Sequence, residues 1–210
     1  MNYDLSLLQQ GLSKWNIDID ENILSKFDNY ISFILEWNKK VNLTRIVEPS
    51  EMIVEHFLDS LSILPLEILD QKSKIIDVGS GAGFPGIPVK IMLPKCNMTL
   101  IDSLNKRIDF LNYTASKLDL SNINIIHTRA EDIAHNISHR ECYDFAVSRA
   151  VAPLRVLLEY CLPFVKVGGF FIAYKGPAAL KEANEAKNAL KMLGGELTDI
   201  KQVNLPYSDK

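Results

Sequence analysis

The stretch KIIDVGSGAGFPGIPVKIM, residues 74–92, contains two overlapping glycine patterns. Residues 79–83 read G-S-G-A-G, and residues 81–86 read G-A-G-F-P-G, which is a G-x-G-x-x-G pattern. A short apolar run precedes the glycines, and a longer one follows them. This order predicts a β-strand, a tight turn and a helix, the unit that opens many nucleotide-binding α/β sheets.

The chain after residue 72 alternates between short apolar runs and amphipathic segments. The apolar runs predict strands at 74–78, 98–101, 123–127, 143–148 and 169–174, with a weaker one near 197–203. The amphipathic segments predict helices at 85–93, 105–118, 153–162 and 178–193. Such alternation predicts an α/β fold with a doubly wound, mostly parallel sheet that carries helices on both faces.

The N-terminal part shows only helical patterns, from about residue 4 to residue 65. Asp18 with Glu21 resembles a capping box, and Ser50 can cap the next helix. We therefore expect residues 1–66 to form a helical extension and residues 67–210 to form one compact unit around the sheet.

Ionisable side chains follow five consecutive predicted strands at their carboxyl ends. They are Asp77, Asp102, His127 or Arg129, Arg149 and Lys175. In open α/β sheets, ligands bind beyond the carboxyl ends of the strands, where the strand order reverses. We therefore expect the functional site at this edge.

The glycines at 79, 81 and 83 let the backbone turn tightly and approach a ligand. Asp102 would accept hydrogen bonds from ribose hydroxyls of either NAD or S-adenosylmethionine, so it does not decide between them. A carboxylate at Asp77 would repel a pyrophosphate but suits the ammonium and sulfonium groups of S-adenosylmethionine. The same carboxylate has a second interpretation, in which it holds the amides of the turn.

Bulk properties limit the class of protein. The chain has 210 residues, 47% of them hydrophobic, which is enough for one full core. Its formal net charge is -3, which gives no sign of a nucleic-acid-binding protein. Its three cysteines show no C-x-x-C spacing, so no metal site is expected and a reducing cytoplasm is the expected location. No signal peptide or membrane span is visible.

Seven segments together resemble the bacterial ribosomal RNA small-subunit methyltransferase G family, also called glucose-inhibited division protein B. They are IIDVGSGAGFPGIP around the turn, WNKKVNLTRI (37–46), EHFLDSL (55–61), LIDSLNKRIDFL (100–111), TRAED (128–132), DFAVSRAVAPL (144–154) and GGFFIAYKG (168–176). The resemblance covers nearly the whole chain. It implies a class I, Rossmann-like methyltransferase that transfers a methyl group from S-adenosylmethionine to N7 of a guanine in 16S ribosomal RNA.

The strand-end pattern and the resemblance together give the expected site residues, and the resemblance itself implies Gly79, Phe84, Ala130, Glu131, Arg149, Asn42, His56 and Asp59. Those expected to contact the cofactor are Asp77, Gly79, Gly81, Gly83, Phe84, Asp102, Ala130, Glu131 and Arg149. Those expected to contact the substrate are Asn42, His56, Asp59, Lys106, Arg107 and Lys175. Taken without the resemblance, His56 and Asp59 read as a solvated helix face and Glu131 as an acid in a helix first turn.

The expected chemistry needs no general base. Guanine N7 carries an exposed lone pair and no proton at neutral pH, so the enzyme has only to align the reacting atoms and exclude water. Arg149 is the residue expected to contribute by positioning, through its grip on a phosphate, the guanine or the cofactor. Neither Cys142 nor Cys161 is placed to act as a nucleophile.

We expect the partner to be 16S ribosomal RNA within the assembled small subunit, bound by a monomer. The chain stops at NLPYSDK, so the last antiparallel strand usual in this fold is expected to be missing, through a truncation of the gene product or of the expressed chain. Two alternatives remain at this point, namely a methyltransferase acting on a small molecule or protein, and a less favoured NAD-dependent oxidoreductase.

Overall fold

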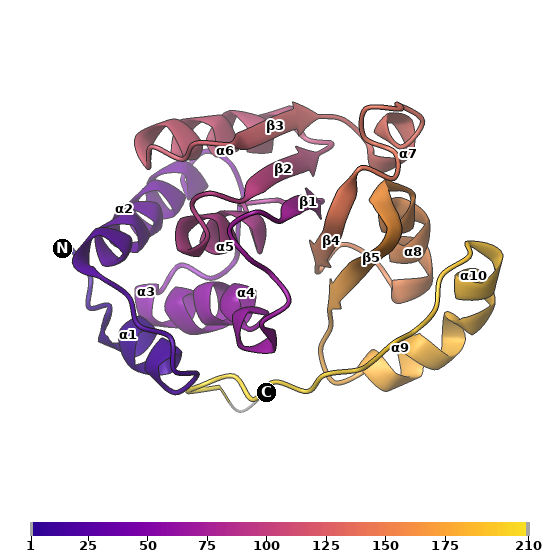
Figure 1. Ribbon diagram of the computed structural model, residues 1–210. Helices are drawn as coiled ribbons and strands as arrows, with labels where there is room; N and C mark the ends of the chain where they lie inside the picture. The colour runs from indigo at the N-terminus through magenta and orange to yellow at the C-terminus, as the bar shows by residue number, and fades with distance from the viewer. Residues whose placement is uncertain (1, 209–210) are drawn as a thin grey trace.

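The computed structural model describes residues 2–208, so residue 1 and residues 209–210, the ends of the two expected units, lie outside the described part. At the centre is a five-stranded sheet in the order β3-β2-β1-β4-β5, and all four pairings are parallel (Figure 1). The strands are β1 Lys74–Val78, β2 Asn97–Asp102, β3 Ile123–His127, β4 Tyr143–Arg149 and β5 Val165–Tyr174. The predicted doubly wound sheet is confirmed, and its order reverses beside β1.

Helices cover both faces of this sheet. Their bounds are α1 Ser6–Ser13, α2 Glu21–Asn38, α3 Pro49–Met52, η1 Ile53–Leu58, α4 Asp59–Leu61, η2 Leu64–Leu66, α5 Gly86–Met92, α6 Asn105–Lys117, α7 Ala130–Ile133, α8 Leu154–Cys161, η3 Leu162–Phe164, α9 Ala179–Glu185 and α10 Lys187–Met192. The N-terminal helices lie on the same side as α5 and α6, whereas α7 and α8 lie on the other side (Figure 1).

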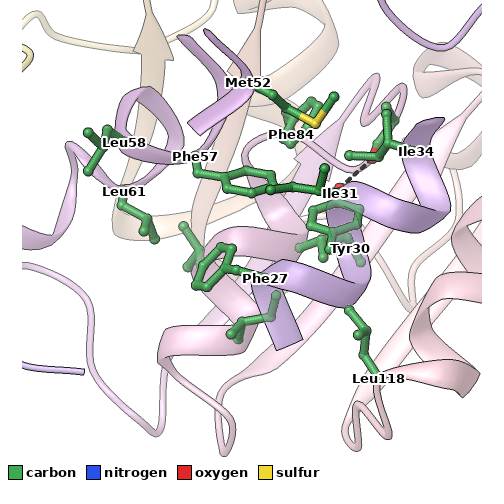
Figure 2. Close-up of a cluster of buried hydrophobic side chains, with 14 of the residues drawn as sticks. Phe27, Tyr30, Ile31, Ile34, Met52, Phe57, Leu58, Leu61, Phe84 and Leu118 are labelled. Carbon is green, nitrogen blue, oxygen red and sulfur yellow. Dashed lines mark hydrogen bonds between the residues drawn. The ribbon is translucent and has the colours of Figure 1, made fainter. Parts of the chain in front are cut away.

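The core follows the two-residue period of the strands. In β1, Ile75 belongs to the cluster on the side of the N-terminal helices, and Ile76 belongs to the cluster that contains residues of α7 and α8. Figure 2 shows part of the larger cluster, in which Phe27, Tyr30 and Phe57 have no exposed surface. The ring centroids of Tyr30 and Phe57 are 5.5 Å apart. The N-terminal helices and the sheet therefore share one core.

Two helix starts differ from the sequence-based expectation. Asp20, not Asp18, caps α2, because its side chain accepts a hydrogen bond from the amide of Ile23 at 2.8 Å. The next helix begins at Pro49, one residue before the expected cap at Ser50. Proline suits this first helical position because it lacks an amide that would stay unbonded.

The C-terminal part shows the larger corrections. Residues 197–203 form no strand, so that prediction is wrong. The side chain of Asp199 accepts from the amide of Ile200 at 2.7 Å and pairs with Lys201 at 2.8 Å, local bonds that compete with strand pairing. The helix expected at 178–193 is divided into α9 and α10.

Strand β5 is longer than expected, because it begins at Val165 rather than Gly169. Its register against β4 is interrupted between Tyr143 and Phe145, where β5 carries extra residues. A Cβ atom on Gly169 would lie 2.6 Å from the carbonyl oxygen of Asp144, so this close approach requires glycine. The glycine pair therefore marks a bulge inside the strand.

The last described residues return to the N-terminal helices. The hydroxyl of Tyr207 donates to Gln10 at 3.1 Å, and the ammonium group of Lys14 lies 3.9 Å from the centre of the Tyr207 ring. This segment crosses below the sheet in Figure 1. Within residues 2–208, none of the helices combines the length and apolar character needed to cross a membrane.

Candidate functional site

The glycine turn connects β1 to α5 at the edge where the strand order reverses. Gly79, Gly81 and Gly83 have φ angles of +76°, +61° and +96°, which residues with side chains rarely adopt. The amides of Gly79 and Ser80 donate to the carbonyl of Ile101 in β2 at 2.9 and 3.1 Å. The turn is thus fixed to the neighbouring strand, and its glycines are required by backbone conformation.

Asp77 lies beneath this turn with no exposed surface. One carboxylate oxygen accepts a hydrogen bond from the amide of Gly86, the first residue of α5, at 2.9 Å. Burial raises the pKa of Asp77 to about 7, and the bond from Gly86 opposes this rise. One of the two expected roles, holding the backbone at the start of α5, is seen directly in this bond, and the cofactor contact of Asp77 stays a prediction.

Asp102, at the end of β2, holds the turn from the other side. Its carboxylate accepts from the amide of Gly81 at 2.9 Å and from the amide of Leu104 at 2.9 Å. The guanidinium group of Arg107 also donates to it at 3.3 Å. Asp102 is only 3% exposed, so its oxygens serve the protein's own groups. Arg107 is therefore held by its ion pair with Asp102 at the end of β2.

The open space above the turn lies over Gly81. A Cβ atom there would have no neighbour closer than the carbonyl oxygen of Gly79, at 4.0 Å. A Cβ atom on Gly79, in contrast, would lie 2.6 Å from a methyl group of Val151. The loop after β4 therefore covers one end of the turn and leaves the other end accessible.

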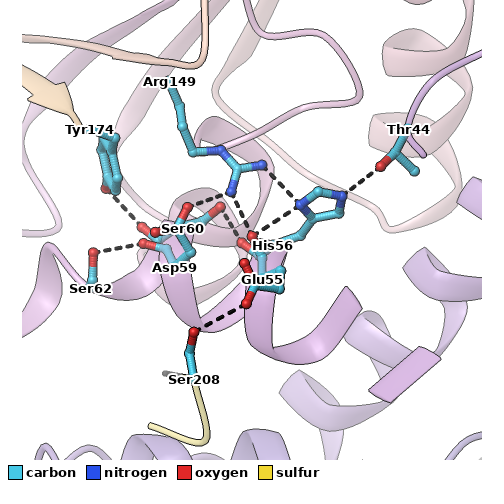
Figure 3. A network of polar contacts seen from close by, with 9 residues as sticks. All are labelled: Thr44, Glu55, His56, Asp59, Ser60, Ser62, Arg149, Tyr174 and Ser208. Carbon is cyan, nitrogen blue, oxygen red and sulfur yellow. Dashed lines mark hydrogen bonds and ion pairs between the residues drawn. The ribbon is translucent and has the colours of Figure 1, made fainter. Parts of the chain in front are cut away.

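Arg149, the last residue of β4, is the centre of a polar network (Figure 3). One guanidinium nitrogen donates to the carboxylate of Asp59 at 2.5 Å and to the carbonyl oxygen of Glu55 at 3.0 Å. The other lies 3.2 Å from Nδ1 of His56. The side chain of Arg149 is 13% exposed, so this charge is held at a largely buried position.

The residues that meet Arg149 come from one helical stretch, Pro49–Leu61, whose middle part, η1, is a π-helical turn. Such turns are uncommon and occur frequently at functional sites. Figure 3 shows Glu55, His56 and Asp59 on the side of this helix that faces Arg149. The predicted pair His56 and Asp59 therefore lies at the end of β4, and its interpretation as a solvated helix face is wrong.

The ring of His56 has contacts at both nitrogens. Nδ1 lies 3.2 Å from a guanidinium nitrogen of Arg149, which is a donor, and 3.1 Å from the carbonyl oxygen of Glu55, which is an acceptor. Nε2 lies 2.7 Å from the hydroxyl of Thr44. Burial, with a further contribution from the positive charge of Arg149, lowers the pKa of His56 to about 4. The ring is thus neutral at physiological pH, and both nitrogens are engaged.

Phe84 lies inside this network. It is 5% exposed, its ring centroid is 4.5 Å from that of His56, and the guanidinium carbon of Arg149 lies 4.9 Å from the ring centre. On its other side it packs against Tyr30 and Phe57. The structure thus uses Phe84 as a platform for the polar network, a role that its expected cofactor contact did not include.

The remaining predicted residues lie around this edge. Ala130 and Glu131 begin α7 just beyond β3, the first buried and the second exposed. Asn42 and Lys106 are exposed. Lys175 is held inward, because its ammonium group donates to the carbonyl oxygen of Ala152 and to the carboxylate of Glu182, each at 2.8 Å.

Several residues of the site escaped sequence reasoning. The hydroxyl of Tyr30 donates to the carbonyl oxygen of Ala82 in the glycine turn, and the hydroxyl of Tyr174 donates to the carbonyl oxygen of Ser60 at 2.8 Å. Tyr30 sits among apolar residues at helical spacing, so the pattern indicated only a core position. Its one signal was the hydroxyl, because buried tyrosines usually find a partner for it.

The parallel sheet and its glycine turn give the chain the fold of class I methyltransferases. A solved S-adenosylmethionine-dependent methyltransferase from Aquifex aeolicus has the same fold, with a TM-score of 0.51 and 21% identity over 70% of this chain and 83% of that one. Residues 23–208 match the family described as rRNA small subunit methyltransferase G (GidB). The chain belongs to this family.

Curated relatives agree along the whole chain. The ribosomal RNA small subunit methyltransferase G of Alkaliphilus metalliredigens is 49% identical over 203 residues, which is 97% of this chain and 85% of that protein. The protein of the same name from Acetivibrio thermocellus is 51% identical, with 97% and 83% covered. The resemblance seen in the sequence is confirmed, and the oxidoreductase alternative is set aside.

Proposed function

We propose that this methyltransferase transfers a methyl group from S-adenosylmethionine to N7 of a guanine in 16S ribosomal RNA. The observation that carries the proposal is one network that joins three distant segments: Arg149 at the end of β4 contacts the helix of Glu55–Asp59, and His56 of that helix contacts Thr44. All three lie inside the range that matches the family. A site that consisted of the cofactor loop alone would not need Thr44 or the Glu55–Asp59 helix.

The glycine turn fits a nucleoside cofactor. Space is open above Gly81, and the exposed residue Glu131 follows β3, which lies two strands from β1 in the sheet. We propose that Gly79, Gly81 and Ala130 line the cofactor, with Glu131 and Arg149 as polar partners. When bound, S-adenosylmethionine supplies an electrophilic methyl group. Asp77, Gly83 and Asp102 contribute by holding the turn, and Phe84 by supporting Arg149.

The polar network suits a nucleophile that needs no deprotonation. His56 is the histidine of this network, and both its nitrogens are engaged by Thr44 and Arg149. Its lowered pKa makes the ring a weak base. Guanine N7 already presents a free lone pair, so the chain has only to orient the base and exclude water. We propose that Arg149, with His56 and Asp59, provides this orientation.

The RNA contact is proposed to be local, because the protein as a whole is acidic. Exposed basic residues follow the ends of β2 and β3 and lie in the loop that carries Thr44. They are Lys39, Lys40, Arg45, Lys106 and Arg129. In A-form RNA, N7 faces a deep and narrow groove, so the target guanine must be unpaired or splayed out. We propose that a monomer acts in the cytoplasm on the assembled small subunit, with Asn42 in the contact.

Mapping of 7-methylguanine tests this function. Purified protein is incubated with S-adenosylmethionine and with either small subunits or naked 16S RNA from cells that lack the modification. The expected result is one methylated guanine, formed faster on the subunit. Equal rates on both substrates would refute the preference for the particle. Methylation of a base atom other than N7, or of ribosomal protein alone, would refute the proposed function.

A further inference from the structure

The loop between β4 and α8, residues 150–153, continues directly from Arg149. Its first residue, Ala150, has a φ angle of +56°, in the left-handed region that alanine rarely adopts. Its second residue, Val151, packs against Gly79 so closely that a Cβ atom there would lie 2.6 Å from a valine methyl. The loop therefore touches both the polar network and the glycine turn.

Two charged residues hold this loop from behind. The ammonium group of Lys175, just after β5, donates to the carbonyl oxygen of Ala152 at 2.8 Å. It also pairs at 2.8 Å with the carboxylate of Glu182 in α9. The same carboxylate oxygen of Glu182 accepts from the amide of Leu154, the first residue of α8, at 2.7 Å. The side chains of Lys175 and Glu182 are 14% and 24% exposed.

We propose that Lys175 and Glu182 are positioning residues that fix the 150–153 loop, and through it Arg149 and Val151, for methyl transfer. The inference deepens the proposed function and rests on it. An unfavourable backbone conformation persists only where its surroundings impose it, and these two contacts fix the C-terminal end of the loop, at Ala152 and Leu154. The pair, which we name the loop clasp, faces the loop backbone rather than the RNA.

The direction of each contact makes the clasp different from an ordinary ion pair. The carbonyl of Ala152 requires a donor, and the amide of Leu154 requires an acceptor. Exchanging the two side chains in K175E/E182K keeps the opposite charges but places a carboxylate against the carbonyl and an ammonium group against the amide. A simple charge pair would survive this exchange, whereas the clasp would not.

Methyl-transfer kinetics with the full chain test the proposal. We expect K175M and K175E/E182K to lower kcat/KM for S-adenosylmethionine by about tenfold or more, because small displacements of positioning groups are costly. E182Q keeps an acceptor for Leu154 and should stay within about threefold of the wild type. The matched control exchanges Lys181 and Glu185, an exposed pair in α9 at 3.9 Å. It should leave the kinetics unchanged.

Hydrogen–deuterium exchange provides a readout that does not depend on activity. The amides of residues 150–156 should exchange faster in K175M, while those of β1 keep the wild-type rate. Recovery of wild-type kinetics by K175E/E182K, or unchanged loop exchange in K175M, would overturn the inference. If K175M shows faster loop exchange but the wild-type protein methylates no RNA, the proposed function is overturned and the loop clasp is retained.

Discussion

Arg149 is placed where a single side chain can join several parts of the site. Its planar guanidinium group reaches the carboxylate of Asp59 and the carbonyl of Glu55 with one nitrogen and His56 with the other. Its face lies against Phe84. A lysine ammonium group at this position would offer the charge without the fork or the flat face. The arrangement therefore uses a fork and a flat face that only arginine supplies.

Replacing Arg149 by alanine is expected to lower kcat/KM for methyl transfer by about tenfold or more, because the network loses its centre. R149K should recover little of this loss, since it restores charge alone. The measurement is incorporation of labelled methyl groups into small subunits. Arg140 precedes β4 at the opposite edge of the sheet, and R140A serves as the control. Unchanged turnover in R149A would remove Arg149 from the mechanism.

His56 should make stability depend on pH in a defined interval. Its native pKa, about 4, lies below its ordinary value of 6.5, so between these values the unfolded chain binds more protons. The stability contributed by neutral His56 is therefore present above pH 6.5 and lost as pH falls toward 4.

The variant H56N lacks this titration. The difference in unfolding free energy, variant minus wild type, should rise as the pH is lowered through this interval. Urea unfolding at several pH values measures it. In the R149A background the rise should be smaller, because Arg149 contributes to the lowered pKa. A difference that stays constant across the interval would contradict the assignment.

Some site residues were predictable from the sequence because their position follows from topology. Arg149 ends a strand, and strands of a parallel sheet deliver their last residues to one edge. His56 was predicted only through the resemblance, since the helix pattern alone indicated solvent. Lys175 was placed at this edge correctly, but its partners could not be predicted. A charged residue at a strand end does not reveal that its ammonium group will bond to the carbonyl of Ala152 and to Glu182.

At the scale of elements, the loop after α2 is shaped by the last residue of that helix. The side-chain oxygen of Asn38 accepts from the amides of Leu43 and Thr44 at 2.8 and 3.1 Å, and its nitrogen donates to the carbonyl of Thr44 at 3.0 Å. Thr44 then meets His56. Asn38 thereby connects a helix end to the polar network.

The variant N38A is expected to lower the free energy of unfolding by about 1–2 kcal/mol, because three hydrogen bonds are lost at a partly exposed site. It should also lower kcat/KM for the small subunit by about fivefold or more, since Thr44 is no longer fixed. Thermal unfolding and methyl incorporation measure the two effects. Asn29 makes one side-chain bond to Ser25 within the same helix, so N29A is the control. Equal activity in the two variants would contradict the role given to Asn38.

The central strands were predictable nearly to the residue, because β1 to β4 are short apolar runs separated by more polar segments. The start of β5 was not, since the bulge at Gly168 and Gly169 depends on where β4 lies. Likewise, the weak apolar pattern at 197–203 carried no information about the local bonds of Asp199 that prevail there. Periodicity detects burial, whereas pairing partners are a tertiary property.

For the whole molecule, the important feature is the core shared by the N-terminal helices and the sheet. Phe27 and Phe57, whose ring centroids lie 5.0 Å apart, belong to the same cluster as Leu100 of β2 and Phe110 of α6. We propose that residues 1–66 and residues 67–210 are distinct in sequence but fold as one unit.

Unfolding should therefore show a single transition. Both tryptophans, Trp15 and Trp37, lie in the N-terminal part, and Trp37 packs against Phe110 and Tyr113 of α6. Their fluorescence therefore reports on that part and on its contact with α6, whereas far-UV circular dichroism reports on the entire chain. We expect the two curves to coincide in urea, as two-state unfolding requires. A fluorescence transition at lower urea than the dichroism transition would show that the extension unfolds independently.

The shared core also has a consequence for synthesis on the ribosome. Helix α2 packs its apolar side against α5 and α6, which are translated afterwards, and α1 packs against η1. Strand β1 likewise pairs with β2 and β4, so its pairing is complete only after β4 has been translated. The nascent chain must therefore emerge with unsatisfied apolar stripes, and its early helices are natural clients for chaperones until the fourth strand has left the exit tunnel.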